Sequence, residues 1–169
     1  QSLQCAPSVS GLTALSETGY HIAPRLTLEI NLALPEDELW QNMKSHVQRN
    51  IRKAQRASFE ISDRWDSEQA YDLFRQTFER HNQRCEVSRQ FFDEIATGVL
   101  LQDNRNRFCA WQGDRLLGYL VALHYKRTVY YQLAAASDDG RTAGVPSLLV
   151  WEMLRAYQAL GFEHFDFLG

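Results

Sequence analysis

The last third of the chain alternates apolar segments of different length, which predict a strand, a helix and a second strand. The run TVYYQLAAAS, which begins at Thr128, has the composition and length of a strand. The turn-like stretch DDGRTAGVP leads into SLLVWEMLRAYQAL, which is too long for a strand and stops at Gly161. FEHFDFLG then predicts the second strand. Because strands joined by a helical crossover run parallel, we predict a right-handed β-α-β unit.

The turn inside this unit has features of an anion-binding site. Pro146 at the first helical position costs no hydrogen bond, because an N–H at that position has no partner within the helix. Gly144 allows a ligand to approach the backbone closely. The free N–H groups of the first helical turn and the helix dipole favour an anion, and Arg141 can add a bidentate contact. A turn followed by a well-capped helix explains the same residues without a ligand.

The first third of the chain predicts a strand and a long helix. RLTLEINL, residues 25–32, alternates leucine or isoleucine with polar residues and predicts a half-buried strand. Pro35 then begins a helix that is predicted to run to about Ala57. Its apolar stripe has helical spacing and consists of Trp40, Met43, Val47, Ile51 and Ala54.

The middle of the chain predicts one short strand, two helices and a hairpin. FEISDR, residues 59–64, fits a short or edge strand. Asp66 or Ser67 caps a helix that reaches about Asn82, and Ser88 caps another that extends to Val99 and Leu100. NRFCAWQ and RLLGYLVALHY flank a Gly-Asp turn and predict an antiparallel hairpin, whose second strand is apolar on both faces and therefore central.

Composition and missing motifs narrow the class of protein. The chain has 169 residues, 44% of them hydrophobic, and a net charge of −3, which fits one globular domain. It has no apolar run of membrane-spanning length and no signal peptide at its start, so we predict a cytoplasmic protein. Its three cysteines (Cys5, Cys85 and Cys109) form no metal-binding or disulfide pattern, and we predict no metal site; Cys109 fits a small core residue. Phosphate-loop, HExxH and GxSxG motifs are also missing from the sequence.

The order of elements predicts an α/β fold with a mixed, mostly antiparallel sheet, flanking helices and one β-α-β crossover near the C-terminus. We expect residues 1–24 to be irregular and residues 25–169 to form the domain. This order resembles the GNAT acyltransferase superfamily, whose sheet splays between its fourth and fifth strands to admit an acyl donor. The superfamily's pyrophosphate loop is similar to Arg141, Thr142, Ala143, Gly144 and Val145, although Pro146 occupies its last glycine position.

Two segments make the resemblance more specific. ELWQNMKSHVQRNIRKAQRASFEI, residues 38–61, and PSLLVWEMLRAYQALGFEHFDFLG, residues 146–169, resemble the Fem-type aminoacyltransferases and their bacterial relatives described as BioF2-like or type-six acetyltransferase domains. The resemblance implies transfer of an acyl group to the amine of a small molecule or peptide. It implies acetyl-CoA or another acyl-CoA as donor, with acyl carrier protein or aminoacyl-tRNA as alternatives. The implied donor-binding residues are Leu133, Ala134, Ser147 and residues 141–145.

The fifth strand and its neighbour supply the candidate catalytic residues. Asp166 is the first candidate for the general base, because a carboxylate between aromatic residues in a sheet is costly unless it is paired or functional. A structural carboxylate that accepts backbone hydrogen bonds is the alternative. His164 has a suitable ordinary pKa but equally fits an exposed strand end, and Tyr130 is the third candidate. We expect Tyr130 and Gln132 on one face of their strand, with Tyr131 and Leu133 on the other.

The chain departs from the superfamily at its end. A helix and two strands follow the fifth strand in the superfamily, and in many members that helix carries a tyrosine that protonates the leaving thiolate. This sequence stops at Gly169. We therefore expect either a fragment of a longer protein or an open strand edge that a second copy completes, as in a homodimer.

A cluster of positive charge leaves two other functions open. Lys44, Arg49, Arg52, Lys53 and Arg56 follow one another without an acidic residue. They fit either a solvated helix face or contact with a tRNA acceptor end, as in Fem-type enzymes. The other function left open is a catalytically silent binding module. It does not depend on the charge cluster, and the altered loop and the missing strands permit it.

Overall fold

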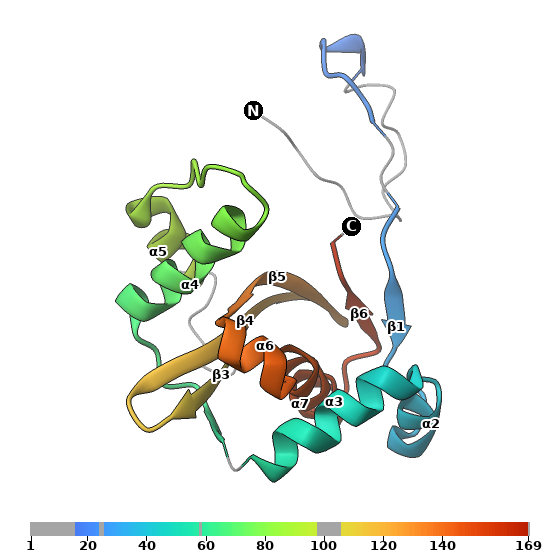
Figure 1. The fold of residues 1–169 in the computed structure, drawn as a ribbon. Coiled ribbons are helices and arrows are strands. Elements are labelled where there is room, and N and C mark those ends of the chain that lie inside the picture. Colours follow the sequence, from blue (N-terminus) through green and yellow to red (C-terminus); the bar gives the residue numbers. More distant parts are fainter. Residues whose placement is uncertain (1–15, 24–25, 58, 98–105, 169) are drawn as a thin grey trace.

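The computed structural model describes residues 16–23, 26–57, 59–97 and 106–168, in which a six-stranded sheet carries helices on both faces (Figure 1). The strands lie in the order β1-β6-β5-β4-β3-β2. Only the β5–β6 pair is parallel, and the other four pairs are antiparallel. The strand bounds are β1 Glu29–Asn31, β2 Glu60–Ser62, β3 Arg107–Gln112, β4 Arg115–Tyr125, β5 Thr128–Ala136 and β6 His164–Asp166. The predicted mixed, mostly antiparallel sheet is therefore confirmed.

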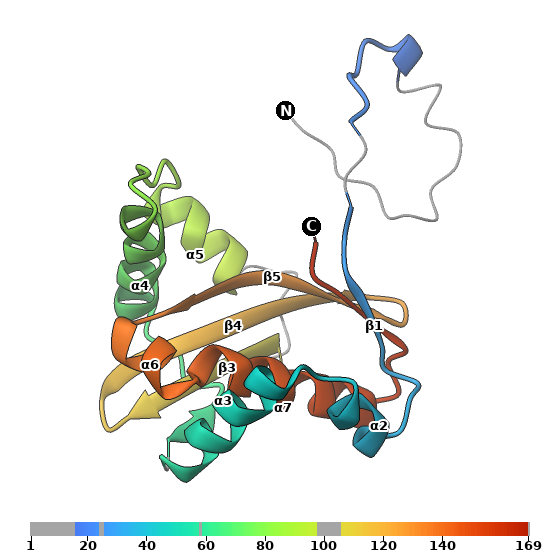
Figure 2. The ribbon, with the colours of Figure 1, turned by 45° about the vertical axis from the view of Figure 1, so that its right-hand side comes forward.

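Two groups of helices cover the two faces of the sheet (Figures 1 and 2). α3 and α7 lie on one face with the short α2 and α6 near them, and α4 with α5 covers the other face. The helix bounds are α2 Glu36–Gln41, α3 Ser45–Arg56, α4 Ser67–Arg80, α5 Arg89–Thr97, α6 Asp138–Ala143 and α7 Val145–Ala159. Asp66 accepts the backbone N–H groups of Glu68 and Gln69, and Ser88 accepts that of Phe91, so both predicted caps are confirmed.

The β-α-β unit forms as predicted, with one additional element. β5 and β6 are parallel and α7 connects them. The stretch predicted as a turn contains α6, whose N-terminus is capped by the Ser137 hydroxyl. Gly140 makes this short helix possible, because a Cβ at that position would lie 2.3 Å from the backbone oxygen of Leu117. The chain therefore turns closely over the first residues of β4 before α7 begins.

The single helix predicted from Pro35 to Ala57 is wrong, because the chain breaks between α2 and α3. Lys44 has an extended backbone, with φ −59° and ψ 140°. The Trp40 carbonyl at the break accepts hydrogen bonds from the Met43 N–H and from Gln48 Nε2 at 2.7 Å. The Trp40 ring also packs edge-on against Trp151 of α7, with 5.2 Å between centroids. The packing of Trp40 against α7 and the two hydrogen bonds to its carbonyl thus offset the free-energy cost of interrupting the helix.

The prediction of a half-buried strand over residues 25–32 is correct only for its last part. Ile30 lies in β1 and Leu32 is buried, whereas the side chains of Leu26 and Leu28 are exposed. Both leucines precede β1, and the chain before β1 extends away from the sheet (Figure 2). The alternation of apolar and polar residues therefore continues through residues 26–28, but their apolar side chains do not pack against the hydrophobic core.

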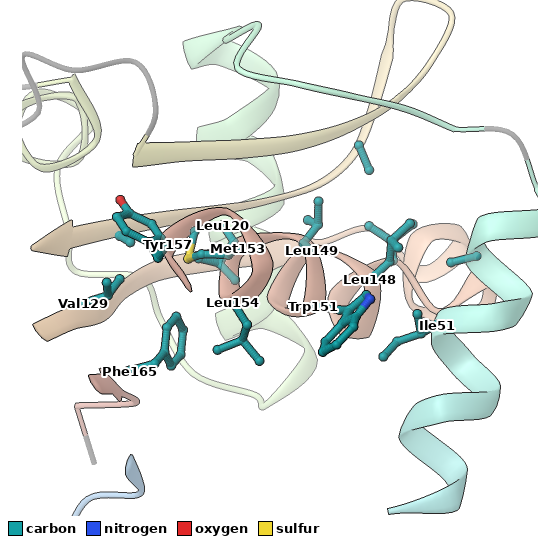
Figure 3. Packing of buried hydrophobic residues seen from close by; sticks show 14 of the residues in the cluster. Ile51, Leu120, Val129, Leu148, Leu149, Trp151, Met153, Leu154, Tyr157 and Phe165 are labelled. Carbon is teal, nitrogen blue, oxygen red and sulfur yellow. The ribbon is translucent and has the colours of Figure 1, made fainter. Parts of the chain in front are cut away.

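α7 supplies the largest part of the main core, which Figure 3 shows from close by. Its buried residues pack against β4 and β5 and against Ile51 of α3; they include Leu148, Leu149, Trp151, Met153, Leu154 and Tyr157. A second cluster, which contains Phe92, Trp111 and Tyr119, fills the space between the sheet and helices α4 and α5. Cys109 belongs to this second cluster and is fully buried, as predicted.

β1 covers the outer edge of β6, which corrects the prediction of an open edge completed by a second copy. The pairing is antiparallel, with Glu29 opposite Asp166 and Asn31 opposite His164. The edge of β6 is therefore satisfied by the same chain. The predictions for Cys5, for most of residues 1–24, and for Val99 and Leu100 lie outside the described residues.

Candidate functional site

The two parallel strands separate at a bulge in β5. β6 pairs with β5 only over residues 128–130, and β5 then continues to Ala136. Opposite β4, Val121 pairs with Leu133 and the next residue, Ala122, pairs with Tyr131, so Gln132 is an extra residue in β5. Such a bulge bends a strand and increases its twist. The bulge therefore lies where β5 leaves β6.

The bulge also changes which side chains share a face. Tyr131 packs with the cluster on the α7 side, whereas Leu133 packs with the cluster on the α4 side. The prediction that these two residues share a face is therefore wrong, since it assumed a regular alternation along β5. Ala134 returns to the α7 side.

A pocket of about 170 Å³ lies against the free part of β5 and is bordered by four other elements. Three consecutive alanines of β5 form one wall, and Pro146 and Leu149 of α7 contribute apolar surface. The full lining consists of Thr77, Arg80, Tyr119, Leu120, Tyr131, Ala134, Ala135, Ala136, Arg141, Pro146 and Leu149. The pocket thus combines small apolar side chains with two arginines.

Two arginines from different helices line this pocket: Arg80 belongs to α4 and Arg141 to α6. Arg80 Nη1 lies 3.6 Å and Arg141 Nη1 lies 3.5 Å from the same atom, Asp138 Oδ1. Arg80 Nη2 also donates a 3.0 Å hydrogen bond to the Thr77 hydroxyl. An arginine pair beside an apolar slot is suited to a ligand that carries phosphate next to a narrow apolar part.

Two tyrosines border the pocket in their neutral form. Burial raises the pKa of Tyr119 and of Tyr131 well above the ordinary value of a phenol, so each hydroxyl keeps its proton at neutral pH. The Tyr119 hydroxyl is buried and has no hydrogen-bond partner among the described residues. Either phenol can therefore donate a hydrogen bond but is poorly suited to accept a proton.

The three predicted catalytic residues lie where β5, β6 and β1 are paired. Tyr130 is directly opposite Asp166, and Asp166 is opposite Glu29. Asp166 is only 4% exposed, and its Oδ1 atom accepts hydrogen bonds from the Thr27 hydroxyl and the Leu168 N–H. His164 Nδ1 lies 2.8 Å from Glu29 Oε1, and both side chains are exposed. None of the three is among the residues that line the pocket described above.

The predicted donor-binding residues separate into two groups. Ala134 and Arg141 line the pocket, whereas Leu133 packs with the α4-side core and Val145 is fully buried. Ser147 faces a second hollow of about 230 Å³, which α3 and the region around Met43 border. In the Arg141–Gly144 segment, the Thr142 carbonyl accepts a 2.7 Å hydrogen bond from Lys53, and Ala143 is half-buried.

Gly144 is close to α3 rather than to an open ligand site. Its φ is +88°, and a Cβ on it would lie 2.4 Å from the backbone oxygen of Asn50. The sequence correctly indicates that this glycine permits a close approach, but the approaching group is the backbone of another helix. Contact between this loop and a donor therefore has to involve the α6 side, where Arg141 lies.

Sequence analysis missed Arg80, Tyr119 and the bulge at Gln132. Arg80 is one of several charged residues near the end of the helix predicted to reach about Asn82, and nothing in the local sequence distinguishes it. Tyr119 lies in an apolar strand that predicts only a central position. The bulge carries no glycine, so the strand pattern gives no signal for it.

Within the described ranges, no three metal-ligating side chains come together, and no helix combines the length and apolarity needed to span a bilayer. Burial raises the pKa of the Cys109 thiol to about 12, so it is protonated at neutral pH. The pocket beside β5 is the candidate site because two arginines and two tyrosines border it.

The family profile described as the acetyltransferase (GNAT) domain matches residues 41–169. The chain therefore belongs to this family, and the recognition made from its sequence is confirmed. No curated protein matches the chain.

Solved structures show the same fold at low sequence identity. A structure of FemX aligns with a TM-score of 0.72 and 14% identity over 87% of this chain and 53% of that one. A GCN5-related N-acetyltransferase from Sphaerobacter thermophilus aligns with a TM-score of 0.54 and 13% identity over 64% of this chain and 34% of that one. The DUF2156 C-terminal domain of a putative lysylphosphatidylglycerol synthetase from Agrobacterium fabrum has a TM-score of 0.50 and 14% identity, over 83% and 45%. The chain thus spans about half or less of the length of each.

Proposed function

We propose that this chain transfers an acyl group from a thioester or aminoacyl carrier to an amine by direct attack of the amine on the acyl carbon. The separation of β5 from β6 beside the apolar pocket is the observation that carries the proposal. Main-chain groups of the free part of β5 are not used by β6 and are available to a donor. Family membership supports acyl transfer in general.

The proposed donor is an acyl-CoA whose phosphate groups lie near Arg141 and whose narrow arm follows Ala134 to Ala136. The small side chains of these alanines leave room along the strand. In this arrangement the acyl carbon lies toward the bulge at Gln132, where β5 and β6 meet. Direct attack needs a positioned amine and an anchored donor but no covalent enzyme intermediate.

Asp166 is the proposed proton acceptor for the attacking amine; Tyr130, opposite it on β5, and His164, two residues earlier in β6, are the alternative candidates. Both described hydrogen bonds to Asp166 go to Oδ1, so its Oδ2 atom is the proposed acceptor. The amine proton moves to this oxygen as the carbon–nitrogen bond forms, and the bond from the acyl carbon to the carrier's sulfur or oxygen breaks. A thioester carrier leaves as its thiolate, and an ester carrier leaves as an alkoxide that takes the proton back from Asp166 to become a hydroxyl. A structural role for Asp166, bracing β1 against β6, accounts for the same two bonds.

The test of this proposal is charge reversal at Arg141. We expect Arg141→Glu to weaken binding of an acyl-CoA by about tenfold or more, since a guanidinium–phosphate contact becomes a repulsion. Isothermal titration of the 169-residue chain measures this affinity. Arg115→Glu is the matched control, because Arg115 is an exposed arginine that pairs with Asp139 and does not line the pocket. Equal affinity in wild type and Arg141→Glu would exclude the contact.

Aminoacyl-tRNA is the second proposed donor, and the position of α3 favours it. Lys53 of the basic helix reaches the Thr142 carbonyl beside α6, so α3 lies next to the segment that carries Arg141. A nucleic-acid donor at the pocket would therefore pass near positive charge on both sides. Steeply salt-dependent binding of a CCA-ended RNA, without binding of acyl-CoA, would favour this donor. Binding of neither would favour the catalytically silent module.

A further inference from the structure

Arg80 is a charged residue in a protected position that the proposed acyl transfer does not yet explain. It lies at the end of α4, and its side chain is only 23% exposed. Its Nη2 atom donates a hydrogen bond to Thr77, one turn earlier in the same helix, and its Nη1 atom lies 3.6 Å from the Asp138 carboxylate. Arg80 and Thr77 both line the pocket beside β5.

The partner of Arg80 is weakly held. The Asp138 side chain is 81% exposed, and each of the two arginines lies 3.5–3.6 Å from its Oδ1 atom, at the long end of ion-pair distances. In the described part of the chain, neither guanidinium pairs with a second carboxylate. One carboxylate therefore lies near two guanidinium groups, and ion pairs at these distances to an exposed carboxylate contribute little stability.

The geometry points to an anion site formed by Arg80 and Arg141, in which Asp138 is an internal occupant that a phosphate group of the ligand displaces. This inference rests on the proposed function and assigns it a second arginine, from the opposite face of the sheet. A phosphate carries more charge than a carboxylate and offers more acceptor oxygens to two guanidinium groups. Displacement of Asp138 returns its carboxylate to solvent, where it is already mostly exposed.

The site selects carriers that have a phosphate ester close to a narrow apolar arm. Coenzyme A, the phosphopantetheine arm of a carrier protein and the end of a tRNA all contain phosphate esters. The wall beyond the arginines consists of Ala134 to Ala136, Pro146 and Leu149, which offer few polar partners for a ribose. We therefore assign the site to a phosphopantetheine-type carrier, with coenzyme A as the probe.

Removal of the internal occupant is the decisive experiment. We expect Asp138→Asn to bind coenzyme A roughly three- to fivefold more tightly than wild type, because the competing carboxylate is lost. Arg80→Gln should bind it about tenfold more weakly. Pantetheine, which lacks phosphate, should bind all three proteins equally. Isothermal titration at fixed salt concentration gives each affinity.

The chain provides matched controls for both substitutions. Asp139→Asn and Arg115→Gln alter the neighbouring ion pair, which lies outside the pocket, and should leave coenzyme A affinity unchanged within twofold. Arg80→Lys tests the guanidinium without removing charge and serves as the second variant if Arg80→Gln unfolds. Unchanged or weaker binding by Asp138→Asn would overturn the internal-occupant role, and unchanged binding by Arg80→Gln and Arg80→Lys would overturn the two-arginine site.

Inorganic pyrophosphate and a CCA-ended RNA separate the remaining outcomes. If pyrophosphate binds Asp138→Asn more tightly and Arg80→Gln more weakly than wild type, this result supports the anion site independently of any acyl-transfer activity. RNA binding with this pattern, and no binding of coenzyme A, overturns the phosphopantetheine assignment. If coenzyme A affinity changes among the variants as predicted but no transfer to any amine is measured, the proposed function is contradicted and the anion site is not. Transfer activity with equal affinities in all variants contradicts the anion site alone.

Discussion

Asp166 and Tyr119 illustrate two ways in which this chain buries a polar side chain. The carboxylate of Asp166 accepts hydrogen bonds from the Thr27 hydroxyl and the Leu168 N–H. These two bonds compensate for its burial between β1 and β5. The hydroxyl of Tyr119 is buried without a described partner and borders the pocket. An uncompensated buried hydroxyl costs stability, and a ligand group that accepts a hydrogen bond from it would recover that cost.

Removal of the Tyr119 hydroxyl tests this difference. We expect Tyr119→Phe to leave the free energy of unfolding unchanged or to raise it by up to about 1 kcal/mol, since an unsatisfied group is lost. Tyr157→Phe is the control. It removes a buried 2.6 Å hydrogen bond to Asn106 and should destabilise by about 1–2 kcal/mol. Urea denaturation measures both, and a loss of more than 1 kcal/mol in Tyr119→Phe would show that its hydroxyl is satisfied in the folded chain.

At the scale of elements, the junction between α6 and α7 depends on how closely α3 can approach it. Gly144 ends α6 and begins α7 with a left-handed backbone, and its missing side chain admits the Asn50 carbonyl of α3. Lys53, one turn further along α3, donates to the Thr142 carbonyl of the same junction. These contacts fix the segment that presents Arg141 to the pocket.

A methyl group at Gly144 should therefore be more costly than backbone strain alone. We expect Gly144→Ala to lower the free energy of unfolding by at least about 2 kcal/mol, from the left-handed backbone and the clash with the Asn50 backbone together. Gly113→Ala separates the two causes, because Gly113 also has a positive φ but would place its Cβ in open space. Equal losses in the two variants, measured by urea denaturation, would contradict the close contact with α3.

For the whole molecule, the sequence predicted the order of strands and helices and the parallel β5–β6 pair, because hydrophobic spacing and caps are local signals. It did not predict the break at Lys44, where packing of Trp40 on Trp151 outweighs helix propensity. It also missed the bulge at Gln132 and the pairing of β1 with β6, which depend on partners distant in sequence. The site prediction was similarly limited: it contained Arg141 and Ala134 of the pocket but not Arg80.

The role of β1 at the whole-molecule scale can be tested by truncation. A chain that starts at Thr27 keeps β1 and the bond from Thr27 to Asp166, and we expect it to remain folded. A chain that starts at Leu32 loses β1 and exposes the edge of β6, so we expect concentration-dependent self-association. Light scattering after size-exclusion chromatography measures both. Identical monomers from the two truncations would contradict the role of β1 in covering β6.

The pairing of β1 with β6 also bears on how the chain is made. Thr27 and Asp166, which are 139 positions apart, must meet before the sheet is complete. During synthesis β1 emerges before the other five strands of the sheet and β6 after them, so β1 stays unpaired until β6 has been made. The exposed Leu26 and Leu28 beside it are apolar surface of the kind that chaperones recognise during that interval. Pairing of these distant segments is thus expected to be slow compared with formation of the β3–β4 hairpin.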